Sequence, residues 1–220
     1  AYKEEKTIAE LIGSVQQADN GTLTKEIIVV DNNSTDSTHA ICEKIQGITL
    51  VTETAKGKGA ALKRGIRESQ GDIVIFQDAD LEYDPNDYQA MIQPILANEA
   101  SAVLGVRIEG RGPYGFVIYV FGWLGNHAIT WLTNILYRHN AKEYEGCYKA
   151  FERALLLSVD VRTNNFDYDN ELVCKLLKRK VKIVDVPIHY YPRKYTEGKK
   201  IHWTHGFLIL WTILKYRFVD

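Results

Sequence analysis

The chain has 220 residues, of which 27 are Lys or Arg and 28 are Asp or Glu, so its formal net charge is −1. This length fits a single catalytic-sized domain, which we predict to span residues 1–220. Because there is no overall basic excess, the composition argues against a nucleic-acid partner.

The first half of the chain alternates predicted helices and strands. Apolar residues at helical spacing predict helices at 4–17 and 57–69, and capping residues predict further helices that begin after Ser34 and at Asp84. Runs rich in β-branched residues predict the strands, which are 25–31, 47–53, 72–78 and 101–107. This alternation is typical of an α/β fold with a mostly parallel central sheet and helices on both faces. Such sheets bind ligands beyond the carboxyl ends of their strands, so the loops that follow the strands form the candidate site.

The second half contains two apolar segments. No residue between 113 and 137 carries a formal charge, but weakly polar residues recur there at every fourth position. This spacing predicts an amphipathic helix that packs on the sheet or lies at a membrane surface. The second segment, 207–214, is too short to span a membrane, and the region 173–217 holds 11 basic residues against two acidic ones. We therefore predict C-terminal amphipathic helices that are able to make peripheral membrane contact.

The three cysteines are Cys42, Cys147 and Cys174. They are odd in number, far apart and part of no CxxC or Cys/His cluster, so they suggest neither a disulfide framework nor a zinc site. We therefore expect the protein in the reducing cytoplasm, or held at the cytoplasmic face of a membrane.

Three acidic residues follow the predicted strand in the segment VIFQDADLEYD. If the chain stays extended there, Asp78, Asp80 and Glu82 leave on one side, where their charges repel unless a cation lies among them. Oxygen ligands at a strand end suit Mg²⁺ or Mn²⁺. A calcium EF-hand is excluded because Tyr83 stands where the turn glycine is required. The alternative, helix capping, needs only Asp84.

A metal held by few carboxylates usually leaves positions for substrate phosphates. The sequence GKG at 57–59 is neither a P-loop nor a GxGxxG motif, and its glycines are also explained by the start of a helix. Lys58 at a helix N-terminus would still attract a diphosphate. Asp31, at the end of a buried strand, is a second candidate for ligand contact.

Seven segments together resemble a known family. In chain order they are AYKEEKTI, VVDNNSTDST, GKGAALKRGI, DADLEYDP, GVRIEGR, CYKAFER and VPIHYYPRKYTEGKK. They resemble the family 2 inverting glycosyltransferases of GT-A fold, and within them the dolichyl-phosphate mannose synthase-like branch, whose acceptor is a polyprenyl phosphate. The resemblance implies a GT-A nucleotide-diphospho-sugar transferase fold. It also implies metal-dependent transfer of a hexose from GDP-mannose or a UDP-sugar to dolichyl or undecaprenyl phosphate.

The resemblance also implies roles for individual residues. The donor-binding residues would be Tyr2, Glu4, Asp31, Lys58 and Asp78. Mg²⁺ or Mn²⁺ on the diphosphate would be held by Asp78, Asp80 and Glu82. The acceptor-binding residues would be Arg107, Arg111, Arg193 and Lys199. Asp80, Arg107 and Arg193 would be the catalytic ones. For the basic residues, the alternative is a solvated surface.

The sequence departs from the family pattern at several positions. Asn32 stands where a second Asp is common, and Glu143 replaces an Asp. The family also has a strand before AYKEE, so we expect the first strand to lie upstream of this sequence and to be missing from it.

Two other functions stay open at this point. A sugar hydroxyl acceptor, as in polysaccharide assembly, would require a general base, and Asp167, Asp169 or Glu171 could provide one, although the same residues are also explained as a helix start. A phosphate acceptor needs no base because its second pKa is about 6. The last alternative is a non-catalytic protein that binds a nucleotide sugar.

Overall fold

The computed structural model describes residues 1–108, 116–192 and 204–219, and the side chains of these residues except 116–123 and 204–205. Its first elements are α1 (Ile8–Gln17), β1 (Ile28–Asp31), α2 (Thr38–Cys42), β2 (Thr49–Thr52), α3 (Lys58–Glu68), β3 (Ile73–Ile75), a 3₁₀ turn (Pro85–Asp87) and α4 (Tyr88–Leu96). Then follow β4 (Ala102–Ile108), α5 (Phe116–Tyr137), β5 (Lys149–Glu152), α6 (Arg153–Ser158), α7 (Tyr168–Lys178), β6 (Ile183–His189) and α8 (Thr204–Phe218). The predicted alternation of helices and strands is confirmed.

The strands form two sheets. β1 and β2 pair in parallel, and the second sheet has the order β3-β5-β4-β6. β4 and β6 are parallel, whereas β5 runs antiparallel to both of its neighbours, so β3, β4 and β6 point the same way. The mostly parallel sheet is therefore confirmed, with β5 as the one reversed strand of this four-stranded sheet. The carboxyl ends of β1, β2, β3 and β4 carry the loops in which the sequence analysis places the candidate site.

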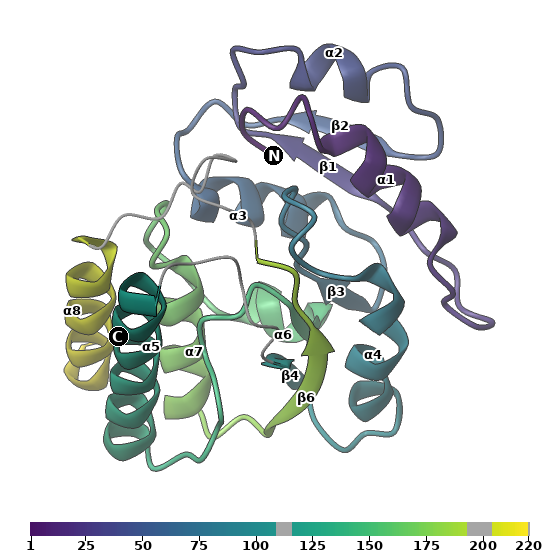
Figure 1. Cartoon of the computed structure of the whole chain (residues 1–220). Coiled ribbons are helices and arrows are strands. Elements are labelled where there is room, and N and C mark those ends of the chain that lie inside the picture. Colours follow the sequence, from purple (N-terminus) through teal and green to yellow (C-terminus); the bar gives the residue numbers. More distant parts are fainter. Residues whose placement is uncertain (109–115, 193–203, 220) are drawn as a thin grey trace.

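Helices cover both faces of the four-stranded sheet (Figure 1). Alternate residues of β4 enter two different hydrophobic clusters, because successive side chains of a strand point to opposite faces. Leu104 packs with Leu172 of α7, whereas Val103 packs with Met91 of α4. Both faces are thus buried, which explains why β4 reads as an almost continuous apolar run.

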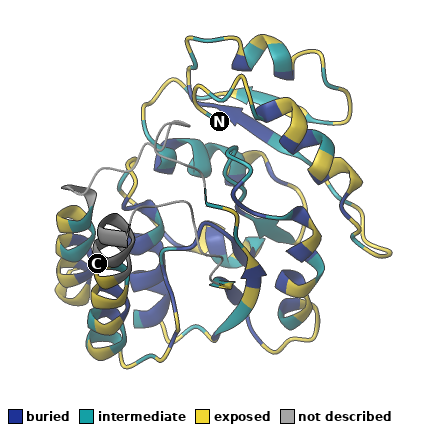
Figure 2. Ribbon diagram, viewed as in Figure 1, coloured by how far each residue is buried: buried dark blue, intermediate teal, exposed yellow. Residues whose placement is uncertain are grey.

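α5 and α8 form an outer layer over α7. Cys174 of α7 packs with Ile129 of α5 and with Ile213 and Tyr216 of α8. α7 is therefore enclosed on two sides, and Figure 2 shows it as mostly buried. The sequence predicted that the apolar segment 113–137 packs on the sheet or lies at a membrane, but its described part packs mainly on α7 and α8.

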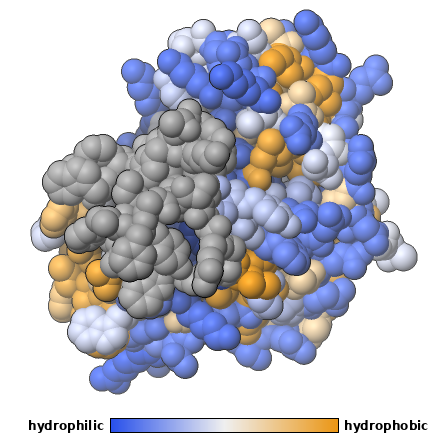
Figure 3. Space-filling model, viewed as in Figure 1, coloured by the Kyte–Doolittle hydropathy of each residue, from blue (hydrophilic) through white to orange (hydrophobic). Residues whose placement is uncertain are grey.

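The outer side of this layer remains apolar. We call it the α5–α8 face, and its exposed apolar side chains are Leu124, Trp131, Ile135, Phe207, Leu208, Trp211, Leu214 and Phe218. Figure 3 shows apolar surface over α8 at the left of the view. No helix within the described ranges is both long and apolar enough to cross a bilayer.

The two sheets are not joined by strand pairing within the described residues. The first residue lies against the end of β1, where Ala1 N donates to Val30 O at 2.6 Å and Asn32 N donates to Ala1 O at 2.8 Å. The expected upstream strand stays a prediction.

Candidate functional site

The N-terminal segment and the end of β1 form the first part of the site. Because Ala1 is hydrogen-bonded to Val30 and Asn32, Tyr2 and Glu4 follow at the carboxyl end of β1, where Asp31 also lies. Asp31 is buried, and its Oδ2 lies 3.1 Å from His39 Nδ1. Tyr2 is exposed.

The acidic segment after β3 is not extended, contrary to the sequence prediction. A turn forms at residues 79–80, and Leu81 has a φ of 61°. Glu82 is consequently buried, and its Oε2 accepts a hydrogen bond from Tyr190 at 3.0 Å. The regular alternation of side chains that the prediction assumed is therefore lost at the turn.

This turn changes the predicted metal site. The described part of the chain contains no group of three or more His, Cys, Asp or Glu side chains arranged to hold a metal ion. The assignment of Asp78, Asp80 and Glu82 as metal ligands therefore stays a prediction. Asp80 remains half-buried, and its Oδ1 accepts a hydrogen bond from Glu82 N at 3.2 Å.

The cation that lies beside Asp78 is Lys58. Its Nζ is 3.2 Å from Asp78 Oδ1 and 3.3 Å from Oδ2 of Asp169, a residue in the first turn of α7. Burial alone would lower the pKa of Lys58, but the carboxylates of Asp169 and Asp78 raise it well above its usual value. Burial would raise the pKa of Asp78, and Lys58 reverses this shift and lowers it. Lys58 and Asp78 are thus held in their charged forms.

Close backbone packing brings Lys58 to Asp169. A side chain at Gly57 would place its Cβ 2.1 Å from Asn164 O, and Gly57 has a φ of 117° that other residues rarely adopt. Gly59 N donates to Asn165 O at 3.2 Å. The two glycines of the GKG motif therefore let the start of α3 approach the loop that precedes α7.

A second lysine completes the charged cluster. Lys149 of β5 is almost fully buried, and its Nζ lies 3.9 Å from Asp169 Oδ1. Nearby, Asn170 Nδ2 donates to Glu145 Oε1 at 2.7 Å, and burial raises the pKa of Glu145. Our sequence analysis missed Lys149 and Glu145, although a lysine inside the apolar strand KAFE was a usable signal, since lysine is almost never fully buried without a partner.

Arg107 is the second-last residue of β4 and has an acidic partner. Its Nε donates to Glu143 Oε1 at 2.7 Å, and its backbone N donates to Glu143 Oε2 at 3.0 Å. The guanidinium also lies over the ring of Tyr190, 4.9 Å from the ring centroid. Burial would raise the pKa of Glu143, but Arg107 lowers it. The other predicted acceptor-binding residues, Arg111, Arg193 and Lys199, lie outside the described residues.

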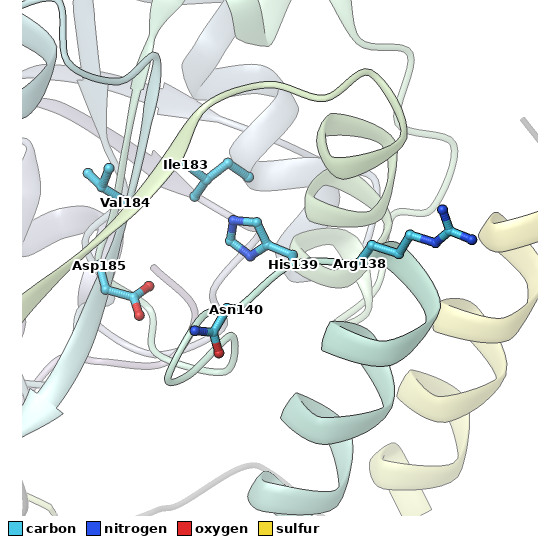
Figure 4. A pocket seen from close by; sticks show the side chains of 6 residues that line it. All are labelled: Arg138, His139, Asn140, Ile183, Val184 and Asp185. Atoms are coloured by element: carbon cyan, nitrogen blue, oxygen red, sulfur yellow. The ribbon is translucent and has the colours of Figure 1, made fainter.

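A hollow of about 510 Å³ lies elsewhere, at the amino end of β6 (Figure 4). Its lining residues are Arg138, His139, Asn140, Ile183, Val184 and Asp185. Figure 4 shows that Arg138 points away from it, toward α8. Since β6 ends at His189, this hollow is at the opposite end of the strand from the charged cluster.

Comparison with known proteins places the chain in a family. Residues 1–156 match the family model described as glycosyl transferase family 2. A relative from Methanococcus voltae, named UDP-N-acetylglucosamine–dolichyl-phosphate N-acetylglucosaminyltransferase, is 26% identical over 237 residues, which cover 97% of this chain and 92% of the relative. Glycosyltransferase AglJ of Haloferax volcanii is 28% identical over 193 residues, which cover 87% of this chain but only 61% of AglJ.

Solved structures show the same fold. Glucosyl-3-phosphoglycerate synthase from Mycobacterium tuberculosis, crystallised with Mn²⁺, UDP-glucose and phosphoglyceric acid, has a TM-score of 0.76 and 23% identity. The match covers 100% of this chain and 78% of that one. The predicted fold class is thereby confirmed. The family match confirms the predicted enzyme class, a glycosyltransferase. The chain belongs to glycosyl transferase family 2.

Proposed function

We propose that this chain transfers a hexose from a nucleoside-diphosphate sugar to a polyprenyl phosphate. The observation that supports binding of the sugar donor is the charged cluster at the carboxyl ends of the strands. There Lys58, at the N-terminus of α3, is held between Asp78 and Asp169. A half-buried ammonium at a helix N-terminus suits a diphosphate, because both the charge and the helix dipole favour an anion. Tyr2, Glu4 and Asp31 would contact the base and ribose.

The oxygen ligands beside Lys58 fit a divalent metal. Mg²⁺ is usually bound by one or two carboxylates plus substrate phosphates, so Asp80, assisted by Asp78, would suffice without Glu82. The structural relatives from Mycobacterium tuberculosis were crystallised with UDP and either Mn²⁺ or Mg²⁺. When bound, such a metal neutralises charge that grows on the leaving diphosphate.

The acceptor half of the proposal follows from the chemistry of a phosphate monoester. One of its oxygens attacks the anomeric carbon with inversion, while the bond from that carbon to the diphosphate breaks and the nucleoside diphosphate leaves with the electron pair. The attacking phosphate is already ionised at neutral pH and needs no base. It needs cations, for which Arg107 is the described candidate, and Arg111, Arg193 and Lys199 stay predictions from the sequence.

The α5–α8 face supports a lipid acceptor. Trp131 and Trp211 are 66% and 63% exposed, and Lys215 and Arg217 lie in the last turn of α8. Exposed tryptophans on helices that also carry basic residues are typical of binding at a membrane surface. A polyprenyl phosphate would reach the enzyme from that surface. The relative from Methanococcus voltae carries a dolichyl phosphate in its name, which is consistent with this proposal.

One observation favours a second candidate, transfer to a sugar hydroxyl. Asp169 Oδ1 is buried and accepts no hydrogen bond from any described residue, so it keeps a lone pair that could accept a proton from a hydroxyl. Against this, the Asp169 carboxylate already has two cationic neighbours, because Lys58 Nζ lies 3.3 Å from its Oδ2 and Lys149 Nζ lies 3.9 Å from its Oδ1. Replacing Asp169 by Asn distinguishes the candidates: transfer to a hydroxyl would be abolished, whereas transfer to a phosphate would only be weakened.

The test is label transfer from GDP- and UDP-sugars, including GDP-mannose and UDP-N-acetylglucosamine, to a short polyprenyl phosphate with Mn²⁺ or Mg²⁺. We expect metal-dependent labelling of the lipid that is lost in Asp80→Asn. The matched control is Asp84→Asn, because Asp84 caps the 3₁₀ turn through Asn86 N and Asn caps equally well. An unlabelled lipid with a labelled sugar acceptor would favour the second candidate. Binding of the donor without any turnover would indicate a non-catalytic protein.

A further inference from the structure

The loop between β2 and α3 is wrapped around one buried side chain. Asn32 is 8% exposed, and its Nδ2 donates to Glu53 O at 3.0 Å and to Ala55 O at 2.7 Å. Its Oδ1 accepts a hydrogen bond from Gly57 N at 2.9 Å. The amide of Asn32 is therefore bound at three points to the segment 53–57.

Only an amide of this size satisfies these three partners. Two of them are carbonyl oxygens that require a donor, and the third is a backbone N–H that requires an acceptor. An ionised aspartate would satisfy Gly57 N but would face the carbonyls of Glu53 and Ala55 without a proton to donate. A buried polar group left without its hydrogen bonds costs stability locally, so the segment would move away.

The clamped segment leads directly into Lys58. Gly57 is held on one side by Asn32 and lies on the other side against the backbone of Asn164. The next residue, Lys58, is the first of α3, and its Nζ bridges Asp78 and Asp169. The position of the ammonium thus depends on a peptide that the Asn32 side chain fixes.

We propose that Asn32 is a positioning residue that acts through the segment 53–57 to hold Lys58 where the donor diphosphate binds. This inference rests on the proposed function, because it assigns the diphosphate to Lys58. It also gives a role to the Asn that stands where a second Asp is common in the family: this side chain binds the protein's own backbone rather than the donor.

The test compares Asn32→Asp with Asn33→Asp. Asn33 is the adjacent residue, it is exposed, and its φ of 59° is one that Asp also tolerates, so the same chemical change is made one residue away. We expect Asn32→Asp to weaken the binding of UDP or GDP, measured by calorimetry, roughly tenfold. The KM for the donor should rise and the KM for the lipid acceptor should not. Asn33→Asp should leave both unchanged.

A double-mutant cycle with Lys58→Ala separates positioning from a general loss of structure. If Asn32 acts through Lys58, adding Asn32→Asp to Lys58→Ala should cause little further loss of nucleotide binding. Independent, additive losses would overturn the proposal. Asn32→Ala, which removes the three hydrogen bonds without adding a charge, provides a second variant in case Asn32→Asp does not fold.

Trypsin provides a readout that needs no donor. Lys56 is exposed within the clamped segment, so release of that segment should speed cleavage after Lys56 in Asn32→Asp and not in Asn33→Asp. Equal cleavage rates in the two variants would show that Asn32 does not hold the segment 53–57 in place. If the unmodified protein binds neither UDP nor GDP, the proposed function fails while the cleavage comparison still decides whether Asn32 holds the segment.

Discussion

The site at the carboxyl ends of the strands contains charged side chains that are shielded from water, whereas the α5–α8 face exposes apolar side chains to water. At the site, Lys58, Lys149, Asp78 and Asp169 are largely withdrawn from water and are stabilised by one another. On the α5–α8 face, large apolar side chains such as Trp131 and Trp211 remain in water with no described partner to cover them. Buried charges and exposed apolar patches are both uncommon in proteins. In the proposed function, the charged donor binds at the site and the apolar lipid is met at the face.

We expect the largest effect from Lys58→Ala, which removes the ammonium from the charged cluster at the site. Its removal leaves Asp78 and Asp169 with only the more distant Lys149 as a described cationic neighbour, so we expect a loss of stability on the order of 2–4 kcal/mol. Sugar transfer should fall roughly 100-fold or more, because the diphosphate loses its cation. Urea unfolding and initial rates measure the two effects.

The control for this variant is Lys63→Ala on the same helix. Lys63 contacts the backbone carbonyls of Val161 and Arg162 at 3.4 Å rather than carboxylates, so its loss should change both quantities little. Similar effects from the two variants would mean that the charged cluster has no special role.

We expect an intermediate effect, on membrane binding, from substitutions on the α5–α8 face. Changing Trp131 and Trp211 together to Glu should reduce flotation with anionic liposomes at low salt by about tenfold or more, because two interfacial anchors are replaced by charges that anionic lipid repels. Leu96→Glu, at an exposed apolar residue at the end of α4, is the control and should float like the unmodified protein. Recovery of the unmodified protein wholly in the soluble fraction would contradict the membrane proposal.

We expect the smallest effect, a pH-dependent change in the free energy of unfolding, from a substitution of Glu145 next to the charged cluster. Burial raises the pKa of Glu145 in the folded protein, so its ionisation costs stability as the pH rises above the unfolded value of about 4.3. Glu145→Gln cannot ionise and should therefore raise the free energy of unfolding at pH 7, and the gain should vanish below pH 4. Glu99→Gln, at an exposed position, should show no such pH-dependent gain. Stabilisation that persists unchanged at low pH would show that burial of the charge is not the cause.

Local sequence patterns predicted the parts of the fold that depend on neighbours in the chain. The strands that end at Asp31 and before Asp78, and the helix that begins beside Lys58, were all identified from periodicity and capping residues. The reversed strand β5 and the edge strand β6 were missed. The extended chain that was assumed for residues 78–82 was wrong, because Leu81 has a positive φ and Glu82 accepts a hydrogen bond from Tyr190.

The sequence alone determined the fold class, the family and part of the list of charged residues at the strand ends, because periodicity and ordered motifs are properties of the chain itself. The tertiary structure alone decided which charges meet. Lys58 reaches Asp169 only because the backbones at Gly57 and Asn164 pack in close approach, and Asn32 binds the segment 53–57 only because β1 and β2 lie side by side. Contacts between residues so far apart in the chain are set by the packing of whole elements, which no local spacing records.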